Sequence, residues 1–336
     1  MRLLFAGTPA TALPSLDALL ASHHDVAAVL TKPDAPVGRG RRLTPSPVAV
    51  RAEEAGVEVI KASRLRNPDL LDRLRGLSPD AAAIVAYGAL VPPDALAIPP
   101  LGWVNLHFSL LPAWRGAAPV QHALLHGDDV TGATTFRLDE GFDTGPVLGV
   151  LTEGVRPRDT TGDLLDRLAR AGAGLLVATL DALERGDGTP QPQPADGVSL
   201  APKLTRDDAR VDWTSPAFHI DRLVRACTPA PGAWTTWGDD RVGLGPVTVL
   251  DAPTPPVETQ RPADGPQQPA DEGRPPNESR LPTEPGEVQV TGDAVLVGCG
   301  DHRVVRLGEV HPPGKRAMDA GAWARGVRGL DGARFT

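Results

Sequence analysis

The first 31 residues alternate two short apolar runs with a segment whose leucines recur at helical spacing. The apolar runs, residues 2–6 and 25–31, are short enough to be buried strands, and the leucines between them predict an amphipathic helix. A strand, a helix and a second strand in this order predict a doubly wound, mostly parallel, Rossmann-like α/β fold. No Gly-x-Gly-x-x-Gly fingerprint follows the first run, so a bound nucleotide is not expected.

The same alternation continues through the first half of the chain. Further strands are predicted at 57–60, 81–86, 131–138 and 146–155, and further helices at 48–55, 68–77 and 119–127. Leucines at helical spacing between 164 and 183 predict one long amphipathic helix that closes this domain. We therefore expect a first domain over 1–187, followed by a linker over 188–207 that is rich in Gly, Pro and Gln.

The second half of the chain has a different pattern. Short apolar or alternating runs between 231 and 310, separated by turns that contain glycine, predict several short strands and a small β-barrel over 208–336. Between two of these runs, residues 251–285 contain ten prolines and almost no large apolar side chain. Such a composition cannot bury enough apolar surface to fold, so we expect a disordered insertion with no assigned function.

Charge and cysteine content narrow the class of protein. The formal net charge of −8 argues against a general nucleic-acid binder, although a local basic patch could still bind RNA. The two cysteines, Cys227 and Cys299, are far apart and match neither a disulfide framework nor a zinc motif. A reducing cytoplasm is therefore the expected location. No apolar run is long enough to span a membrane. We also expect the protein to be a monomer.

The end of one apolar run carries two side chains suited to catalysis. Residues 102–107 read Gly-Trp-Val-Asn-Leu-His, so Asn105 and His107 are two positions apart near the end of a predicted strand. Residues two apart on a strand point to the same face, and open α/β sheets bind ligands beyond the carboxyl ends of their strands. An amide and an imidazole side by side at that edge can donate hydrogen bonds to an oxyanion and move a proton.

Asp143 is a candidate for the carboxylate that would orient this histidine. It lies in the segment Asp-Glu-Gly-Phe-Asp-Thr-Gly at 139–145, between two predicted strands. No serine or cysteine stands in a nucleophile-elbow context, so the residues suit direct transfer to an incoming nucleophile rather than a covalent intermediate. For Asn105 and His107 taken alone, a turn-capping asparagine and a buried structural histidine are the more common interpretation.

Longer strings of residues around Asn105 and His107 favour a catalytic role over a structural one. Asn-x-His-x-Ser-Leu-Leu-Pro at 105–112, Arg-Gly-Ala-Ala-Pro at 115–119 and Asp-x-Gly-x-Asp-Thr-Gly at 139–145 resemble the formyltransferases that use 10-formyltetrahydrofolate. The resemblance covers nearly the whole chain, from Phe-Ala-Gly-Thr-Pro at 5–9 to Pro-Pro-Gly-Lys-Arg-Ala-Met at 312–318. Strings of this length and specificity are not expected by chance.

The resemblance implies an enzyme that transfers the formyl group of 10-formyltetrahydrofolate to the α-amino group of methionyl initiator tRNA, for translation initiation. It also implies a second domain of the oligonucleotide-binding (OB-like) kind and no metal or nucleotide cofactor. The catalytic trio of the family falls on Asn105, His107 and Asp143, with a protonated His107 stabilising the oxyanion. The family's folate contacts fall on Ser109, Leu110, Leu111, Pro112, Tyr87, Gly88 and Leu90.

The tRNA contacts implied by the resemblance are basic. The segment from Lys32 to Pro47 carries four cations against the single acid Asp34, in the place where the family has a basic loop. The expected tRNA-binding residues are Lys32, Arg39, Arg41, Arg42, Lys203, Lys315 and Arg316. For an arbitrary protein, a solvated charged loop is the simpler interpretation of this segment.

The alternatives are a formyltransferase that acts on another amine, such as an amino-sugar nucleotide or a purine precursor, and an RNA-binding relative without activity. A nicotinamide-dependent dehydrogenase is a third, disfavoured by the missing glycine fingerprint. The basic segment, the barrel-like second domain and the Lys315-Arg316 motif favour tRNA over these. His122 and His126 have a spacing that can bind metal on a helix, but no third ligand is evident, so no metal site is expected there.

Overall fold

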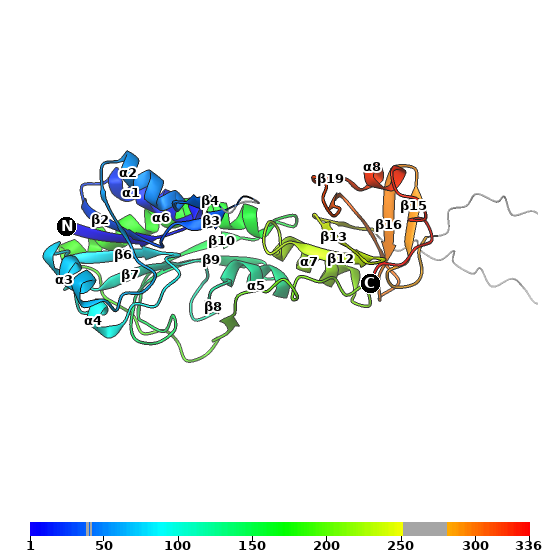
Figure 1. Cartoon of the computed structure of the whole chain (residues 1–336). Coiled ribbons are helices and arrows are strands. Elements are labelled where there is room, and N and C mark those ends of the chain that lie inside the picture. The colour runs from blue at the N-terminus through cyan, green and yellow to red at the C-terminus, as the bar shows by residue number, and fades with distance from the viewer. Residues whose placement is uncertain (38–39, 41, 251–280) are drawn as a thin grey trace, which may run out of the picture. The chain divides into compact units, whose positions relative to one another are not determined.

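The computed structural model describes residues 1–37, 40, 42–250 and 281–336. They form two compact units, Met1–Lys203 and Leu204–Thr336, which Figure 1 colours from blue to red along the chain. None of the helices in the described part of the chain is both long and apolar enough to cross a membrane. The arginines at 39 and 41, and all but the last five residues of the proline-rich segment, lie outside the described residues.

A seven-stranded sheet forms the centre of the first unit, in the order β10-β9-β7-β6-β1-β2-β5. Its strands are β1 (Arg2–Gly7), β2 (Asp25–Thr31), β5 (Glu58–Lys61), β6 (Ala81–Val85), β7 (Trp103–His107), β9 (Val130–Arg137) and β10 (Val147–Gly154). The strands from β7 to β5 run parallel, whereas β9 runs antiparallel to both of its neighbours, β7 and β10. The chain order reverses at β1, which lies between β2 and β6, so the carboxyl ends of β1 and β6 flank a topological switch point. The predicted doubly wound, mostly parallel α/β fold is confirmed.

Helices cover both faces of this sheet. They are the 3-10 helix η1 (Ala10–Ala12) and the helices α1 (Leu13–Leu20), α2 (Pro47–Glu54), α3 (Pro68–Gly76), α4 (Pro93–Leu96), α5 (Pro119–His126) and α6 (Thr161–Arg185). Figure 1 shows α1, α2 and α6 on one face of the sheet and α3 and α4 on the other. The long helix α6 begins at a capping box between Thr160 and Asp163 and ends at Gly186, which is left-handed. Its leucine face packs against β9 and β10, as the leucine spacing predicted.

A buried tryptophan positions the strand that carries the predicted site. Trp103, the first residue of β7, is buried in one cluster with Leu4 of β1 and Leu74 of α3. Its ring nitrogen donates a 2.8 Å hydrogen bond to the carbonyl of Ala95 in α4. β7 therefore begins at a fixed point, and its carboxyl end, where His107 lies, is positioned relative to the rest of the sheet.

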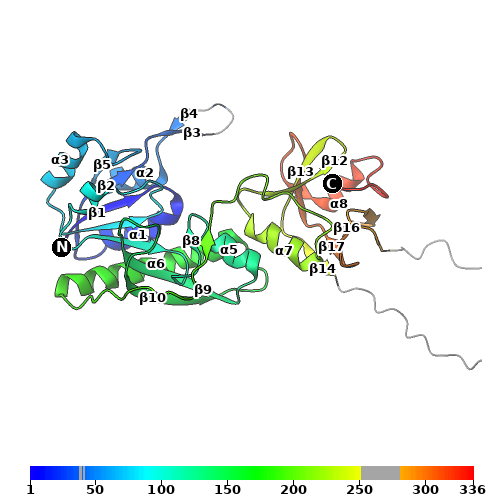
Figure 2. The same ribbon diagram turned by 90° about the horizontal axis from the view of Figure 1, so that it is seen from below.

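The segment predicted as a loop over 32–47 contains a two-stranded hairpin. β3 (Ala35–Val37) pairs antiparallel with β4 (Arg42–Thr44), and Figure 2 shows this pair projecting from the first unit. The pairing gives partners to the backbone groups of a polar segment, which the sequence pattern did not reveal. The hairpin follows β2, whose carboxyl end lies at the same sheet edge as that of β7, because all strands from β2 to β7 are parallel.

The boundary between the two units lies after Lys203, within the predicted linker over 188–207. In the predicted linker over 188–207, Gln191 forms a backbone bridge to β10, and β11 (Leu200–Ala201) pairs parallel with β8 (Arg115–Gly116). These hydrogen bonds give partners to the backbone groups of a segment that lacks apolar periodicity. From its composition alone, this segment was predicted to be a linker. Most of this segment therefore belongs to the first unit.

The second unit contains two four-stranded antiparallel sheets, in the orders β12-β13-β18-β19 and β14-β17-β16-β15. Its elements are α7 (Ala217–Ala226), β12 (Ala233–Trp237), β13 (Asp240–Leu244), β14 (Thr248–Leu250), β15 (Val288–Thr291), β16 (Ala294–Gly298), β17 (Val304–Arg306), β18 (Glu309–His311), β19 (Met318–Asp319) and α8 (Ala320–Arg325). Both sheets contribute to one buried core that includes Trp213, Trp323 and Phe335. The second domain of antiparallel strands, predicted as a small OB-like β-barrel, is confirmed, and its described strands form two four-stranded sheets.

Candidate active site

A cavity of about 520 Å³ lies at the carboxyl ends of β6 and β7, beside the switch point between β1 and β6. Its walls are the loop after β6, the end of β7, the start of α5 and the loop between β9 and β10. The lining residues are Ile84, 86–91, 105–108, Gly116, Ala117, Pro119, Leu138, Asp139 and 141–143. Thr8, in the loop after β1, donates a 3.0 Å hydrogen bond to the carbonyl of Tyr87 and so supports the first wall. The volume is typical of small-molecule sites, which span roughly 300–1,000 Å³.

Asn105, His107 and Asp143 all line this cavity. Asn105 and His107 occupy alternate positions on β7, so the pleat of the strand turns both toward the cavity. Asp143 approaches from the loop between β9 and β10, and its Oδ2 atom lies 3.9 Å from Nδ1 of His107. Both side chains are largely buried, so water screens their interaction only weakly. The structure thus brings together the three residues that the sequence singled out as a catalytic trio.

The protonation state of His107 follows from its neighbours. Its Nε2 lies 2.9 Å from the carbonyl oxygen of Trp114, which can only accept, so this nitrogen carries a hydrogen and Nδ1 is left on the side of Asp143. Burial lowers the pKa of His107, and the charge of Asp143 and the Trp114 carbonyl only partly oppose this effect. The ring is therefore neutral near pH 7. Burial therefore opposes the protonated His107 implied by the resemblance, which stays a prediction.

Asp143 is held by the neighbouring backbone and by one side chain from a distant segment. Its φ of 54° lies in the left-handed region, and its Oδ2 accepts a 2.9 Å hydrogen bond from the Gly116 N–H. Gln193 donates from Nε2 to the carbonyl oxygens of Asp143, at 2.9 Å, and Gly145, at 2.8 Å. Its Oε1 accepts from Arg115, at 3.1 Å from Nε and 2.6 Å from Nη2. Gln193 therefore connects the Arg-Gly motif with the loop that carries Asp143.

Two residues of the site were missed from the sequence. Gln193 lies in the segment predicted as a linker, where no periodicity or motif marked it. Phe142 carried a signal, because it is an apolar residue in an otherwise polar loop. It lines the cavity and is 64% exposed, and the same exposure is found for Leu90 in the loop after β6, which also lines the cavity. Two exposed apolar side chains at one cavity indicate a surface that an apolar part of a ligand would cover.

Gly116 has a conformation that residues other than glycine rarely adopt. Its φ is 137°, and a Cβ atom there would collide with the carbonyl oxygen of Ala201 in β11. The close approach of β8 and β11 therefore requires glycine at this position. Because the same residue donates to Asp143, a side chain at 116 would displace a hydrogen-bond donor of the catalytic carboxylate.

The Ser-Leu-Leu-Pro stretch at 109–112 does not line the cavity. Ser109 is fully buried, and its hydroxyl donates a 2.6 Å hydrogen bond to the carbonyl of Ala113. Thr134 of β9 donates to the Ser109 carbonyl, at 2.7 Å, and accepts from the Leu111 N–H, at 3.2 Å. These bonds fix the turn that follows β7. The folate contacts that the resemblance implies for residues 109–112 stay a prediction.

Tyr87, Gly88 and Leu90 line the cavity. The Tyr87 hydroxyl donates a 2.7 Å hydrogen bond to the carbonyl of Ala62, and burial raises the pKa of Tyr87 to about 12, so its ring is an uncharged, fixed part of the wall. The Lys32 ammonium lies 5.7 Å from the centre of this ring, within reach of a cation–π interaction. Lys32, predicted to bind tRNA, thus contacts the cavity wall.

The other basic residues predicted to bind tRNA lie in separate places. Arg42 is exposed on β4, and Lys203 is the exposed last residue of the first unit. Lys315 and Arg316 are exposed between β18 and β19 in the second unit. Within the first unit, neither Arg42 nor Lys203 lines the cavity that Asn105, His107 and Asp143 line.

Comparison with known proteins identifies the family. The family model described as formyl transferase matches residues 1–180, and the model of the formyl transferase C-terminal domain matches residues 203–328. The chain belongs to the formyl transferase family. This formyl transferase is 58% identical over 335 residues to the methionyl-tRNA formyltransferase of Thermobifida fusca (strain YX), covering 100% of this chain and 99% of the relative. It is 60% identical over 328 residues to the methionyl-tRNA formyltransferase of Salinispora arenicola (strain CNS-205), covering 98% and 97% of the two chains.

A solved structure shares the fold of this formyl transferase. HypX from Aquifex aeolicus in complex with tetrahydrofolic acid aligns with a TM-score of 0.60 at 20% sequence identity. The alignment covers 98% of this chain and 48% of HypX, so the formyl transferase spans about half the length of that protein. At this identity the likeness concerns the fold alone.

The cavity of this formyl transferase combines an amide, a neutral imidazole and a carboxylate. The amide of Asn105 can donate to an oxyanion, and neutral His107 can accept a proton at Nδ1. Asp143 would stabilise the imidazolium that forms, since it lies 3.9 Å from that nitrogen. The residues that line the cavity include no serine or cysteine, so the arrangement suits direct transfer between two bound substrates.

Proposed function

We propose that this protein transfers the formyl group of 10-formyltetrahydrofolate to the α-amino group of methionyl initiator tRNA, as a monomer in the cytoplasm. The observation that carries the proposal is the meeting of Asn105, His107 and Asp143 at one cavity. It is supported by relatives named methionyl-tRNA formyltransferase, whose similarity runs through both units of the chain. The first unit alone would not define which amine accepts the formyl group. The second unit, which matches the formyl transferase C-terminal domain, favours tRNA as the acceptor.

The reaction forms one carbon–nitrogen bond and breaks another. The methionine amine attacks the formyl carbon, and the folate nitrogen leaves with the electron pair of its bond to that carbon. Asn105 donates to the oxyanion of the tetrahedral intermediate, a contribution often worth a factor of about 10²–10³ per donor. His107 takes the proton that the amine loses, and Asp143 stabilises the resulting imidazolium. The proton then reaches the leaving nitrogen through water.

We assign the apolar part of the cavity to the ring system of the folate. Leu90 and Phe142 expose apolar surface on two walls of the cavity, which suits a flat ring placed between them. Gly88 lacks a side chain in the same wall, and its φ of 77° leaves its backbone groups open to a ligand. We also assign folate contacts to residues 109–112, which form the turn that follows β7.

We assign the aminoacyl end of the tRNA to the sheet edge where β7 ends. The exposed Arg42 lies on a hairpin that starts at this edge, and two further arginines precede it in the sequence. The residues that we propose to contact phosphates are Arg39, Arg41, Arg42, Lys203, Lys315 and Arg316. Replacing the three arginines with alanine should raise KM for tRNA, leave folate binding intact and flatten the log–log salt dependence by about one unit per lost phosphate contact. An unchanged KM together with an unchanged slope would remove this hairpin from the tRNA interface.

Incubation with methionyl initiator tRNA and 10-formyltetrahydrofolate tests the whole proposal, with formylmethionine as the measured product. Asn105→Ala and His107→Ala should each reduce turnover by at least about 10²-fold. Asn67→Ala is a matched control, because Asn67 caps α3 outside the cavity. Formylation of an amino-sugar nucleotide or a purine precursor in place of tRNA would overturn the acceptor assignment. Binding of tRNA without any turnover by the wild-type protein would overturn the enzymatic assignment.

A further inference from the structure

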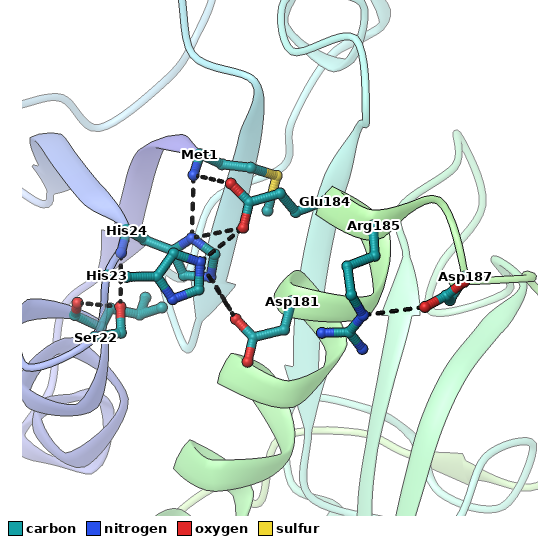
Figure 3. Close-up of polar contacts among 9 residues, drawn as sticks. Met1, Ser22, His23, His24, Asp181, Glu184, Arg185 and Asp187 are labelled. Atoms are coloured by element: carbon teal, nitrogen blue, oxygen red, sulfur yellow. Dashed lines mark hydrogen bonds and ion pairs between the residues drawn. The ribbon is translucent and has the colours of Figure 1, made fainter.

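A second cluster of reactive side chains lies at the sheet edge opposite the cavity. His23 and His24 directly precede β2, and Asp181 and Glu184 lie in the last turns of α6, as Figure 3 shows. One possible ligand atom from each of the four side chains lies within 4.8 Å of the others. β2 begins at this edge, whereas the catalytic cavity lies at the carboxyl ends of the parallel strands. The cluster is therefore separate from the catalytic site.

The distances within the cluster suit a small coordination shell. Nε2 of His23 lies 2.7 Å from Oε2 of Glu184 and 3.9 Å from Oδ1 of Asp181. Nε2 of His24 lies 3.0 Å from the same oxygen of Asp181, and its Nδ1 lies 3.8 Å from Oε2 of Glu184. Ligands at about 2.0–2.2 Å from a tetrahedral zinc ion are separated from one another by about 3.3–3.5 Å. The four observed separations, from 2.7 to 3.9 Å, include values both below and above this range.

His24 is the most constrained member of the cluster. Its side chain is 0% exposed, and its Nε2 has no hydrogen-bond partner among the described residues. Oδ1 of Asp181 lies 3.0 Å from this nitrogen and also has no hydrogen-bond partner among the described residues. The two atoms therefore lie close together without hydrogen-bond geometry. Buried polar atoms normally have hydrogen-bond partners, so two buried, unpartnered atoms that face each other indicate a place for a bound cation.

We propose that His23, His24, Asp181 and Glu184 bind a divalent transition-metal ion, of which Zn²⁺ is the best match. Two imidazole nitrogens and two carboxylate oxygens are a ligand set that Zn²⁺ accepts, whereas Mg²⁺ and Ca²⁺ prefer oxygen ligands. The two carboxylates also offset the charge of the ion. Because the ligands come from two elements, the ion would join the turn before β2 to the end of α6 and stabilise the first unit.

The surroundings hold the ligands in place. The N–H of His24 donates a 3.2 Å hydrogen bond to Oγ of Ser22, which donates to a backbone carbonyl of the same turn (Figure 3). The amine of Met1 donates to Oε1 of Glu184 at 2.5 Å, while the other carboxylate oxygen, Oε2, faces His23. One oxygen of Glu184 thus remains directed into the cluster. Asp181 and Glu184 are three residues apart, so they lie on the same face of α6.

Titration of the EDTA-treated full-length protein with Zn²⁺ in a calorimeter tests the proposal. The wild-type protein should bind one ion at this cluster, and its Tm should rise by about 5–10 °C at free zinc 100-fold above Kd. Asp181→Asn combined with Glu184→Gln keeps the side-chain shapes and removes two ligands. The affinity should then fall by more than the roughly 10–100-fold that the loss of an outer-shell partner costs. Formylation without zinc should be unchanged in this double variant, which shows that it is folded.

Two control variants make the outcome specific. Asp166→Asn lies on the same helix, in an exposed ion pair with Arg170, and should leave zinc affinity unchanged. His122→Gln removes one member of the other closely spaced histidine pair. Co²⁺ should give the absorption of a tetrahedral complex in the wild-type protein and not in the double variant. Absence of saturable binding in the wild type, equal affinity in the double variant, or loss of binding through His122→Gln would each overturn the proposal.

Discussion

Replacing Gln193 with alanine should slow formyl transfer while leaving the fold intact. The side chain donates two hydrogen bonds, to the carbonyls of Asp143 and Gly145, and accepts two from Arg115. Alanine removes all of them, but the backbone bridge at Gln191 remains. The loop that carries the catalytic carboxylate would therefore lose its support, whereas the strands on either side of it would keep their pairing.

The magnitude follows from the two bonds donated to the loop. A neutral hydrogen bond contributes about 1 kcal/mol net, so the ordered loop should lose about 2 kcal/mol relative to other conformations. Asp143 also has a left-handed φ of 54°, which an unsupported loop would tend to leave. A change of about 1–2 kcal/mol shifts a conformational equilibrium by a factor of about 5–30. We therefore expect kcat/KM to fall by about 5–30-fold, with little change in Tm.

The assay is formylation of methionyl initiator tRNA, with Tm measured by circular dichroism. Gln191→Ala is the matched control, because this glutamine is exposed, lies in the same segment and contributes through its backbone. Gln193→Glu is a second test, since a carboxylate can still accept from Arg115 but cannot donate to the two loop carbonyls. It should be at least as slow as the alanine variant. Equal activity of Gln193→Ala and Gln191→Ala, or full activity of Gln193→Glu, would refute this role.

Three further outcomes are expected. Burial lowers the pKa of His107, and in the proposed reaction the neutral ring accepts the proton. The value of kcat should therefore be constant near neutral pH and fall as pH drops through a value below the ordinary pKa of 6.5. A kcat that instead falls as pH rises through neutrality would mean that the charged ring is required. Gly116→Ala should lower kcat by about 10–100-fold, since the added methyl group collides with Ala201 and shifts a donor to the catalytic carboxylate; unchanged steady-state turnover would contradict this. Asp159→Asn should lower the free energy of unfolding at pH 7 by about 2–3 kcal/mol in urea titrations, because Arg167 loses a buried partner. Burial raises the pKa of Asp159, but the hydrogen bonds from Arg167 and the Arg156 N–H, together with the charges of both arginines, outweigh it and keep that pKa low. The difference from wild type should therefore disappear as pH falls through this lowered value.

The sheet of the first unit was predictable because its strands and helices bury apolar faces with regular periods. The run at 25–31 coincides with β2, and the run at 81–86 contains β6. The leucines between 164 and 183 lie inside α6 and form its buried face. The β3–β4 hairpin could not be predicted in this way, because its strands are only three residues long and pair only with each other.

The position of the catalytic trio was also predictable, but its electrostatics were not. Asn105 and His107 are two residues apart on a strand, so a common face follows from backbone geometry alone. The neutral state of His107 depends on how deeply the folded chain buries it and on the carbonyl that its Nε2 meets. The turn at 109–112 likewise depends on Thr134, a neighbour that only the sheet order brings close.

The polar segment at 188–203 shows why a catalytic site is larger than its catalytic residues. Ser199 accepts a 2.8 Å hydrogen bond from the Trp114 N–H, and the carbonyl of Trp114 in turn fixes the tautomer of the catalytic histidine. Gln193, from the same segment, fixes the loop that carries the catalytic carboxylate. Both partners of the proton-transferring pair are thus oriented by one stretch of chain that supplies no reacting group. Because a displacement of about 1 Å can cost about 10²-fold in rate, the catalytic geometry depends on this segment as much as on the motifs that predicted it.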